Sequence, residues 1–497
     1  MNRWGTGSIP FWAWLIARTI GWTAAASIRY QNPPVDVVEM LAWGSRWEWG
    51  YYKHPPLPAW CAETAAWASG GWLPAVYLTS YLFLAAGIWA AWRLARELLG
   101  PDRAILAVLP LEATCFFTWM GGELNHNTAL TGLWALGIWS LWMALSGNTW
   151  IMWMAYGFIV GLGLLCKYNM ALLLAWQALA LLALPEGRRA LATPKPWVAW
   201  LAGLLLFSPH LAWLAGHDWI TLQYLAARGG TRGGFAAGAM GLLGFLAEQS
   251  WMAWGLLIPL FALMGGRSRP AATKPELARY LAITTIGPLA TILLMVLLGK
   301  KVIGFWCFPC YTCAGLVGLA YGGFRDKPGA IRNSLALSGI IVAGLMGLMV
   351  LGDGVLVSRE GKEVRSRFPG RNLAEAAVDF WKEQTGSDRI PIVAGEHWVA
   401  DNIAWFAPGR PMVFVGENPS LPLPVARFNP WTSDEQLMRL GGVFAWEVAK
   451  AGDRVETQLR RRYPGIILTR GVSLPQLGSA REIAFGLAVI PPKVSEP

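Results

Sequence analysis

Charged residues are scarce in this sequence. Only 14% of its 497 residues are Asp, Glu, Lys or Arg, whereas soluble domains carry about 25%. Its 6 cysteines are too few and too scattered for a disulfide framework. Apolar residues make up 55% of the chain instead, and many of its 31 tryptophans lie near the ends of apolar runs, where indole rings prefer the membrane interface. This composition is typical of a polytopic membrane protein.

The formal net charge of +11 does not indicate a nucleic-acid-binding protein. The cations are scattered through short loops between apolar runs, and no basic patch stands out. The positive-inside rule and attraction to anionic lipids explain this distribution better. We therefore expect membrane lipids, and no nucleic acid, as partners.

Three of the cysteines, Cys307, Cys310 and Cys313, recur at a spacing of three within one apolar run. They would share a helix face, which suggests a metal site at first sight. An iron–sulfur cluster normally needs a fourth thiolate and a loop to wrap it. We therefore interpret these cysteines as small apolar residues that pack between helices.

About eleven apolar runs are each near the length of roughly 20 residues that a bilayer requires. The predicted spans are ~9–27, ~73–92, ~104–120, ~128–145, ~150–166, ~169–184, ~197–215, ~238–264, ~278–298, ~305–323 and ~334–352. The first run has no small-residue cleavage site, so it is interpreted as an uncleaved anchor.

Loop charge predicts the orientation of these spans. Cations gather in alternate loops: Arg93, Arg96 and Arg103; Arg188, Arg189 and Lys195; Arg267, Arg269, Lys274 and Arg279; Arg325, Lys327 and Arg332. The positive-inside rule places these loops in the cytoplasm, together with the N-terminus. The first long loop, the loop with Glu123 and the C-terminal region then face outward.

After Gly352 the sequence becomes soluble in character. The β-type runs are Ile390–Ala394, Met412–Val415, Val443–Trp446, Ile466–Thr469 and Ile483–Ile490. They alternate with helical runs such as Asn372–Glu383 and Val455–Arg462, which predicts a small α/β domain. We find no glycine-rich nucleotide fingerprint and no Ser/His/Asp elbow in it.

The stretch 32–60 follows the first apolar run and is too polar to span a bilayer. We expect Asn32 to cap a helix that Gly50 ends. Steps of three and four put these residues on one helical face: Asp36, Glu39, Trp43 and Arg46. Such an amphipathic helix suits a membrane surface. Asp36 or Glu39 can act there as general base toward a hydroxyl or amine, and a solvated helix face is the alternative.

A second polar cluster lies in the outward turn Gly121–Asn127. An acid, Glu123, is followed by a histidine and two amides within five residues. Either these residues belong to a site, or they form an interfacial turn in which Asn127 caps the next helix. Glu112, deeper in the preceding run, is expected to face the bundle interior, because a carboxylate in lipid is costly unless paired or neutral.

Cations on the outward side run against the positive-inside bias. They are Lys53, His54, Lys167, Arg228, Arg232, Lys300 and Lys301. A lipid phosphate would bind them through charge-assisted hydrogen bonds, and contact with phospholipid head groups is the alternative. Paired glycines separate Arg228 from Arg232, so this segment is expected to be mobile and to close over a substrate. It lacks the spacing and the Lys-Ser/Thr end of a P-loop.

No cofactor is clearly indicated, and a divalent metal is left open. To ligate a metal ion, His210 and the pair His217-Asp218 would have to lie close to His54. The chain contains no pair of histidines at the H-x-x-x-H spacing that would favour such a site.

These features together resemble the membrane glycosyltransferases with the GT-C fold. Family 39 is the most similar, namely the protein mannosyltransferases and the bacterial aminoarabinose and galacturonic-acid transferases of lipid A. The resemblance covers most of the chain. The most specific segment is the acidic first loop, which ends at 52–57 in an aromatic residue, cations, Pro-Pro and Leu. The other segments that carry the resemblance are 121–127, Lys167-Tyr168, Ser208-Pro209-His210 with His217-Asp218, and 300–309.

The resemblance implies a mainly α, polytopic GT-C-like bundle of about eleven transmembrane helices over residues 1–352. A periplasmic α/β domain would follow over 353–497, with the whole protein in a bacterial inner membrane. Asp36 would be the catalytic base, with Glu39 beside it, and Glu123 the second acid. Members of the family usually have Asp directly followed by Glu, where two residues separate Asp36 from Glu39 in this chain. They often have Lys directly before Pro-Pro, where this chain has His54. The partner of the donor phosphate therefore stays open between Lys53 and His54.

The implied reaction moves a sugar, hexosyl or pentosyl, from a polyprenyl-phosphate donor to an envelope acceptor, with inversion. The acceptor would be lipid A, another glycolipid, a glycan or a protein. A secondary transporter or flippase of a lipid-linked or anionic substrate is the rival interpretation. Transporters favour paired repeats, broken helices and charges at mid-membrane, and only Glu112 is clearly deep in a span here.

Overall fold

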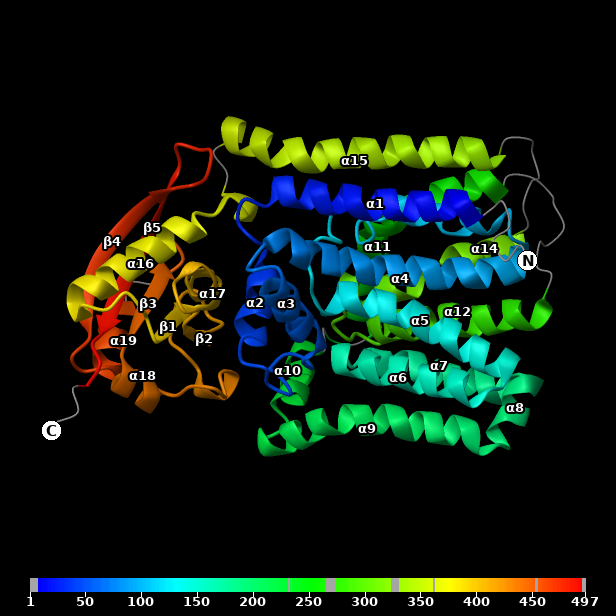
Figure 1. Ribbon diagram of the computed structural model, residues 1–497, viewed down its shortest axis with the longest axis horizontal. Helices are drawn as coiled ribbons and strands as arrows, with labels where there is room; N and C mark the ends of the chain where they lie inside the picture. The colour runs from blue at the N-terminus through cyan, green and yellow to red at the C-terminus, as the bar shows by residue number, and fades with distance from the viewer. Residues whose placement is uncertain are drawn as a thin grey trace.

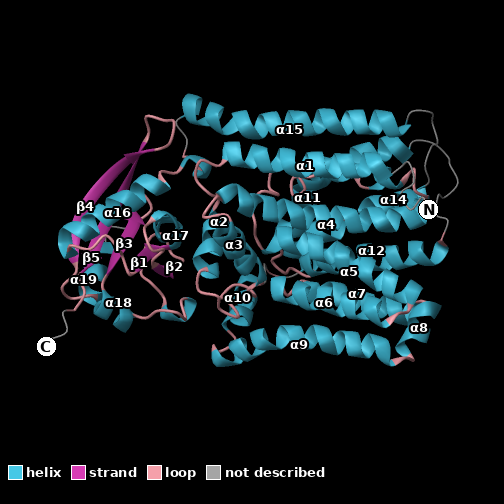
Figure 2. Cartoon of the chain, viewed as in Figure 1, coloured by secondary structure: helices cyan, strands magenta, loops and turns pink. Residues whose placement is uncertain are grey.

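The computed structural model describes residues 8–230, 233, 235–264, 274–322, 330–360, 363–451 and 455–493. In Figure 1 long helices run side by side in a bundle, and a smaller domain lies beyond one end of it. Figure 2 shows the strands gathered in that smaller domain. The protein is thus mainly helical with a small C-terminal α/β domain, as expected.

Most predicted apolar runs form helices of the bundle. Their bounds are α1 Ser8–Arg29, α4 Leu73–Leu99, α5 His126–Gly147, α6 Trp150–Cys166, α7 Met170–Ala183, α8 Pro185–Leu191, α9 Pro194–Gly216, α11 Phe235–Met264, α12 Pro275–Leu297 and α15 Ala330–Glu360. Within the described residues, 5 helices are long and apolar enough to cross a membrane by length and composition, and a sixth is obtained if α7 and α8, bent by 101°, count as one span. The chain is a multi-pass membrane protein.

Two predicted spans are not single helices. The run ~104–120 forms the 3₁₀ helices η1 Ala104–Ala107 and η2 Leu109–Ala113 and then a series of turns. Pro110 lacks a backbone donor, and the buried Glu112 forms an ion pair with Arg18 of α1. The run ~305–323 breaks into η3 Gly304–Cys307, α13 Phe308–Tyr311 and α14 Ala314–Gly322, with Pro309 at the start of α13. The interior position expected for Glu112 is confirmed.

Three short helices lie at the end of the bundle that faces the α/β domain (Figure 1): α2 Val35–Gly44, α3 Leu57–Ala68 and α10 Ile220–Arg228. The predicted bounds of α2 were wrong at both ends. Pro34 stands at its N-cap without a side-chain cap hydrogen bond, so Asn32 does not cap it, and the helix ends at Gly44, well before Gly50. Arg46 therefore lies beyond the helix.

The helix α2 is held between two hydrophobic cores. Met40 and Leu41 pack in the core of the bundle, whereas Val38 and Ala42 pack in the core of the α/β domain. It is therefore an interdomain helix, and this differs from the free amphipathic helix that we predicted at the membrane surface. Burial of both apolar sides fixes the direction of its remaining face, which carries Asp36 and Glu39.

The α/β domain contains the five predicted strands. Its elements are η4 Arg365–Arg367, α16 Gly370–Thr385, β1 Ile392–Glu396, α17 His397–Phe406, β2 Met412–Gly416, η5 Ala426–Phe428, α18 Asp434–Leu440, β3 Gly442–Glu447, α19 Val455–Arg462, β4 Ile467–Pro475 and β5 Glu482–Ile490. The sheet order is β2-β1-β3-β5-β4. β1 pairs in parallel with β2 and β3, for example Val393 with Val413 and Val443, and β5 is antiparallel to both of its neighbours.

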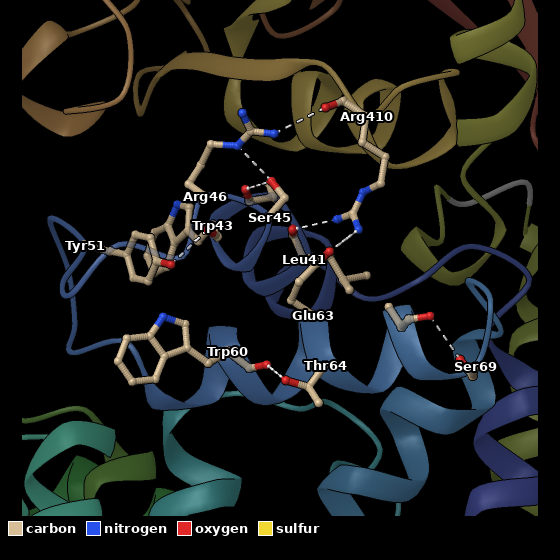
Figure 3. Close-up of polar contacts among 12 residues, drawn as sticks. Leu41, Trp43, Ser45, Arg46, Tyr51, Trp60, Glu63, Thr64, Ser69 and Arg410 are labelled. Atoms are coloured by element: carbon tan, nitrogen blue, oxygen red, sulfur yellow. Dashed lines mark hydrogen bonds and ion pairs between the residues drawn. The ribbon is translucent and has the colours of Figure 1, made fainter.

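An arginine clamp fastens this domain to the bundle (Figure 3). Arg410, in the loop between α17 and β2, binds both carboxylate oxygens of Glu63 on α3, at 2.9 and 2.8 Å. Its second terminal nitrogen donates to the Leu41 carbonyl of α2 at 2.7 Å. The clamp fixes the amino end of β2 relative to α2.

Candidate active site

Asp36 is positioned by the start of α5. The Nδ2 atom of Asn125 donates to Asp36 Oδ2 at 2.8 Å, while Asn125 Oδ1 accepts from the backbone of Asn127 and Thr128. Asn125 is therefore the helix cap, in a capping box with Thr128, and the alternative in which Asn127 caps α5 is excluded. Burial and the charge of Glu39 raise the pKa of Asp36, and the hydrogen bond from Asn125 and the charges of Lys53 and Lys167 oppose this rise.

Asp36 opens onto a cavity of about 320 Å³ between α2, α10 and the bundle. Most of the residues proposed from the sequence meet there. The lining residues are Asp36, Glu39, Lys53, His54, Asn127, Lys167, Tyr168, Asn169, Tyr224, Leu225, Arg228, Ile303, Phe305 and Trp306. An acid with a raised pKa thus shares one small space with three cations.

Lys53 is held by carboxylates from both domains. Its Nζ lies 2.6 Å from Glu39 Oε1 on α2 and 3.2 Å from Glu417 Oε1, which follows β2. Burial alone would lower the pKa of Lys53, but the charge of Glu39, followed by those of Tyr52 and Glu417, raises it well above its usual range. Lys53 is therefore cationic, and Glu39 is occupied as its counter-ion.

Lys167 is held by an amide oxygen and faces an aromatic ring. Its Nζ donates to Asn127 Oδ1 at 2.5 Å and lies 5.8 Å from the ring centre of Trp306. No bonded carboxylate is found for it among the described residues. Burial lowers the pKa of Lys167 to about 8, against smaller opposing effects of Cys166 and Asp36. A buried cation of this kind, 5% exposed, is suited to receive an anion.

His54 lies among the three cations as a neutral imidazole. Burial lowers its pKa well below the usual range, and His126, Lys167, Lys53 and Arg228 lower it further. Its ring centre is 4.1 Å from that of His126. Arg228, at the end of α10, places its guanidinium 5.3 Å from the ring centre of Tyr224. The neutral His54 can donate or accept one hydrogen bond inside this positive field.

Glu123 lies behind Asp36 and is not among the cavity-lining residues. Tyr30 donates its hydroxyl proton to Glu123 Oε1 at 3.2 Å. Burial and the charge of Asp36 raise the pKa of Glu123 to about 7, while Tyr30 and Arg29 oppose the rise. Asp36 and Glu123 are thus neighbouring acids whose ionisations are coupled.

Other residues proposed from the sequence lie elsewhere. Lys300 and Lys301 are exposed and do not line the cavity, and Arg232 falls outside the described residues. Both ring nitrogens of His210 are occupied, by Tyr168 and by the Trp49 carbonyl. His217 binds the Trp213 carbonyl through Nδ1.

The structure does not assemble the metal site that was left open. No group of three or more His, Cys, Asp or Glu residues that could hold a metal occurs among the described residues. Cys307, Cys310 and Cys313 are buried and unbridged in the bundle core, in agreement with a packing role.

Sequence reasoning missed Glu417. It also accepts a hydrogen bond from Tyr52 at 2.8 Å, and Tyr52 stacks on Phe428 of the α/β domain at 4.5 Å between ring centres. No local pattern connects Glu417 to Lys53, because only the docking of the α/β domain brings them together. Tyr224 is likewise a cavity-lining residue without a motif of its own, and Trp306 lies in the segment 300–309 but was not singled out.

Residues 53–213 match the family model described as dolichyl-phosphate-mannose-protein mannosyltransferase. The chain is 26% identical over 393 residues to the lipopolysaccharide core galacturonosyltransferase RgtB of Rhizobium johnstonii, covering 75% of this chain and 76% of the relative. RgtA of the same organism is 23% identical over 447 residues, with 86% and 85% covered.

The fold matches the crystal structure of ArnT from Cupriavidus metallidurans in the apo state, with a TM-score of 0.62, 12% identity, and 99% and 100% of the two chains covered. The same protein bound to undecaprenyl phosphate matches with a TM-score of 0.60 and 12% identity, with 98% and 99% covered. These likenesses confirm the expected GT-C fold.

Proposed function

We propose that this chain transfers a sugar from a polyprenyl-phosphate donor to a glycolipid of the bacterial envelope, in line with its similarity to GT-C membrane glycosyltransferases. The observation that carries the proposal is the shared cavity. Asp36, oriented by Asn125, faces the same space as Lys53, Lys167 and Arg228.

The three cations bind the donor phosphate. Within the described ranges Lys167 is bonded to an amide and to no carboxylate, and Arg228 offers a planar fork of donors that matches phosphate oxygens. The neutral His54 adds one hydrogen bond. Together they stabilise the negative charge that develops on the phosphate when its bond to the anomeric carbon breaks.

Asp36 acts as the general base. It removes the proton from an acceptor hydroxyl as that oxygen attacks the anomeric carbon, while the polyprenyl phosphate leaves from the opposite side. The configuration at the anomeric carbon is therefore inverted. The raised pKa of Asp36 makes its carboxylate a stronger base than an exposed one.

The site would face the periplasm from the inner membrane. In Figure 1 α8, which carries Arg188 and Arg189, lies at the end of the bundle opposite α2 and α10. The positive-inside rule places the α8 end in the cytoplasm, together with the start of α1. The cavity and the α/β domain then lie on the outer side.

The rival transporter interpretation loses its main support. Glu112, the deep acid singled out from the sequence, is an ion-pair partner of Arg18 and also accepts from Trp22 at 3.3 Å. Its role is therefore structural.

Transfer by reconstituted protein tests the proposal. Wild-type protein and Asp36→Asn would be supplied with polyprenyl-phosphate donors of galacturonic acid and aminoarabinose. The acceptor would be lipopolysaccharide from a strain that lacks the gene. Loss of a charged base should reduce the rate by about 10²-fold or more. Asp388→Asn, at an exposed position outside the site, is the matched control. Normal transfer by Asp36→Asn would refute the role of the base.

A further inference from the structure

A second cavity, of about 750 Å³, lies along the junction between the bundle and the α/β domain. Its lining comes from the end of α1, from α3 and the start of α4, and from α16, α17 and the loop that follows. The residues that matter below are Tyr30, Glu63, Tyr77, Arg371 and Arg410. It shares no lining residue with the cavity that contains Asp36.

We propose that this second cavity binds the anionic saccharide of the acceptor glycolipid. The inference rests on the proposed function and adds the place where the second substrate is held. Its volume is within the range of about 300–1,000 Å³ that is usual for small-molecule sites.

The charge of the cavity favours an anion. Arg410 is neutralised by Glu63 and serves as the interdomain clamp. Arg371 is exposed at the start of α16, with its guanidinium 4.9 Å from the ring centre of Phe406. No carboxylate partner of Arg371 is found in the described part of the chain. It therefore offers its charge to a phosphate or carboxylate on the saccharide.

The rim of the cavity favours an amphiphile. Trp67 and Trp72 line it and are 79% and 63% exposed. Both lie near the start of α4, at an end of a membrane-spanning helix, where tryptophan marks the level of the lipid head groups. A lipid-anchored saccharide can enter at this level while its acyl chains stay in the bilayer.

The inner wall offers one unused polar group, the hydroxyl of Tyr77. The Tyr77 side chain is 1% exposed, and its hydroxyl finds no hydrogen-bond partner among the described residues. A buried hydroxyl without a partner is unfavourable unless a ligand satisfies it. The Tyr30 ring packs beside it, with 5.6 Å between ring centres. A sugar hydroxyl supplies the partner that Tyr77 lacks, which a simple phospholipid head group at the rim would not.

Tyr30 links the second cavity to the acids of the proposed site. Tyr30 lines the second cavity, and its hydroxyl donates to Glu123, whose pKa is raised by the charge of Asp36. An acceptor hydroxyl that replaces the Tyr30 hydroxyl on Glu123 would thereby come close to Asp36. Proton removal then occurs as in the proposed reaction, and no additional reactant is needed.

Steady-state kinetics of the full-length protein test this assignment. Arg371→Gln and Tyr77→Phe would be assayed with the donors above and with purified lipopolysaccharide from the deletion strain as the acceptor. We expect the acceptor KM to rise about tenfold for Arg371→Gln, which corresponds to one lost charged contact. The donor KM should stay within about twofold. Arg460→Gln, an exposed substitution on α19, is the matched control.

Three results would overturn the inference. An unchanged acceptor KM in both variants would show that the acceptor binds elsewhere. Equal competition by phosphatidylglycerol vesicles would show a general lipid site. An equal rise in donor and acceptor KM would indicate a distortion of the whole site. None of these coincides with failure of the proposed function, which would appear as absent transfer by the wild-type protein.

Discussion

Lys53 and Glu417 form an ion pair across the two domains, with 3.2 Å between Nζ and Oε1. Glu39 holds the same Nζ at 2.6 Å. The lysine that we propose to bind the donor phosphate thus has two carboxylate partners, and an incoming phosphate would compete with them. Glu417 is the more exposed of the two, so it is the partner that the donor displaces more easily.

Glu417→Gln is therefore expected to improve donor binding. Ion pairs that are partly exposed contribute about 0.2–1 kcal/mol, so the donor KM should fall by up to about fivefold with little change in kcat. Kinetics against donor concentration would measure the effect, with Glu375→Gln on the exposed face of α16 as the control. A higher donor KM would mean that Glu417 helps to hold the donor.

Asn125 has two roles that substitution can separate. Asn125→Asp keeps a good helix cap but replaces the donor to Asp36 by a repelling carboxylate. We expect kcat to fall about 10- to 100-fold, since the orientation of the base is lost, with a small change in melting temperature. Asn125→Ala should lose both the helix cap and the hydrogen bond to Asp36, and loss of the cap should reduce the stability by about 0.5–2 kcal/mol. Similar kcat values for Asn125→Asp and the wild type would exclude the orienting role.

Glu123 should shape the pH profile near neutrality. Asp36 must be ionised to accept a proton, so activity falls as pH falls through its raised pKa. The charge of Asp36 contributes to the rise of the pKa of Glu123 to about 7, so Asp36 is already ionised where Glu123 titrates. Ionisation of Glu123 places a second negative charge beside the base, and the change in kcat that this causes between about pH 6 and 8 should be absent in Glu123→Gln. A profile of Glu123→Gln that is identical to that of the wild type would show that Glu123 does not act on the base.

The same substitution should change the pH dependence of stability. Because burial raises the pKa of Glu123 to about 7, the folded state favours the protonated acid. Its contribution to stability is complete below the pKa of the unfolded chain and is lost as pH rises through about 7. Melting temperatures of Glu123→Gln should therefore decline less than those of the wild type as pH rises through that window.

Local sequence patterns predicted those helices and strands that depend mainly on residues close together in the sequence. The strands around Val393 and Val443 were found because short β-branched runs lie between turn residues. The helix α2 was found from the spacing of Asp36 and Glu39, but its bounds were missed because Pro34, and not Asn32, precedes it. Helical periodicity fixes a face, whereas the ends depend on tertiary packing.

Structural features that depend on contacts between distant segments could not be predicted from the sequence. Hydropathy suggested a helix over ~104–120, yet the Arg18–Glu112 pair and Pro110 accompany an irregular path. Loop charge predicts that a loop lies on the outer side of the membrane, but it does not predict which of its residues lines the cavity. Lys167 therefore reaches the cavity while Lys300 remains exposed. Glu417 escaped because no motif anticipates a contact between domains.

Lys167 should set the alkaline limit of donor binding. Its pKa of about 8 means that at pH 9 only about a tenth of it is protonated in the free enzyme. If the ammonium binds the donor phosphate, the donor KM should rise up to about tenfold between pH 7 and pH 9. Lys167→Arg should remove this rise, because a guanidinium stays protonated, even if its larger group lowers kcat. Lys382→Arg, on the exposed face of α16, should keep the wild-type profile. A rise that persists in Lys167→Arg would assign the titration to another group and leave Arg228 and Lys53 as the phosphate-binding cations.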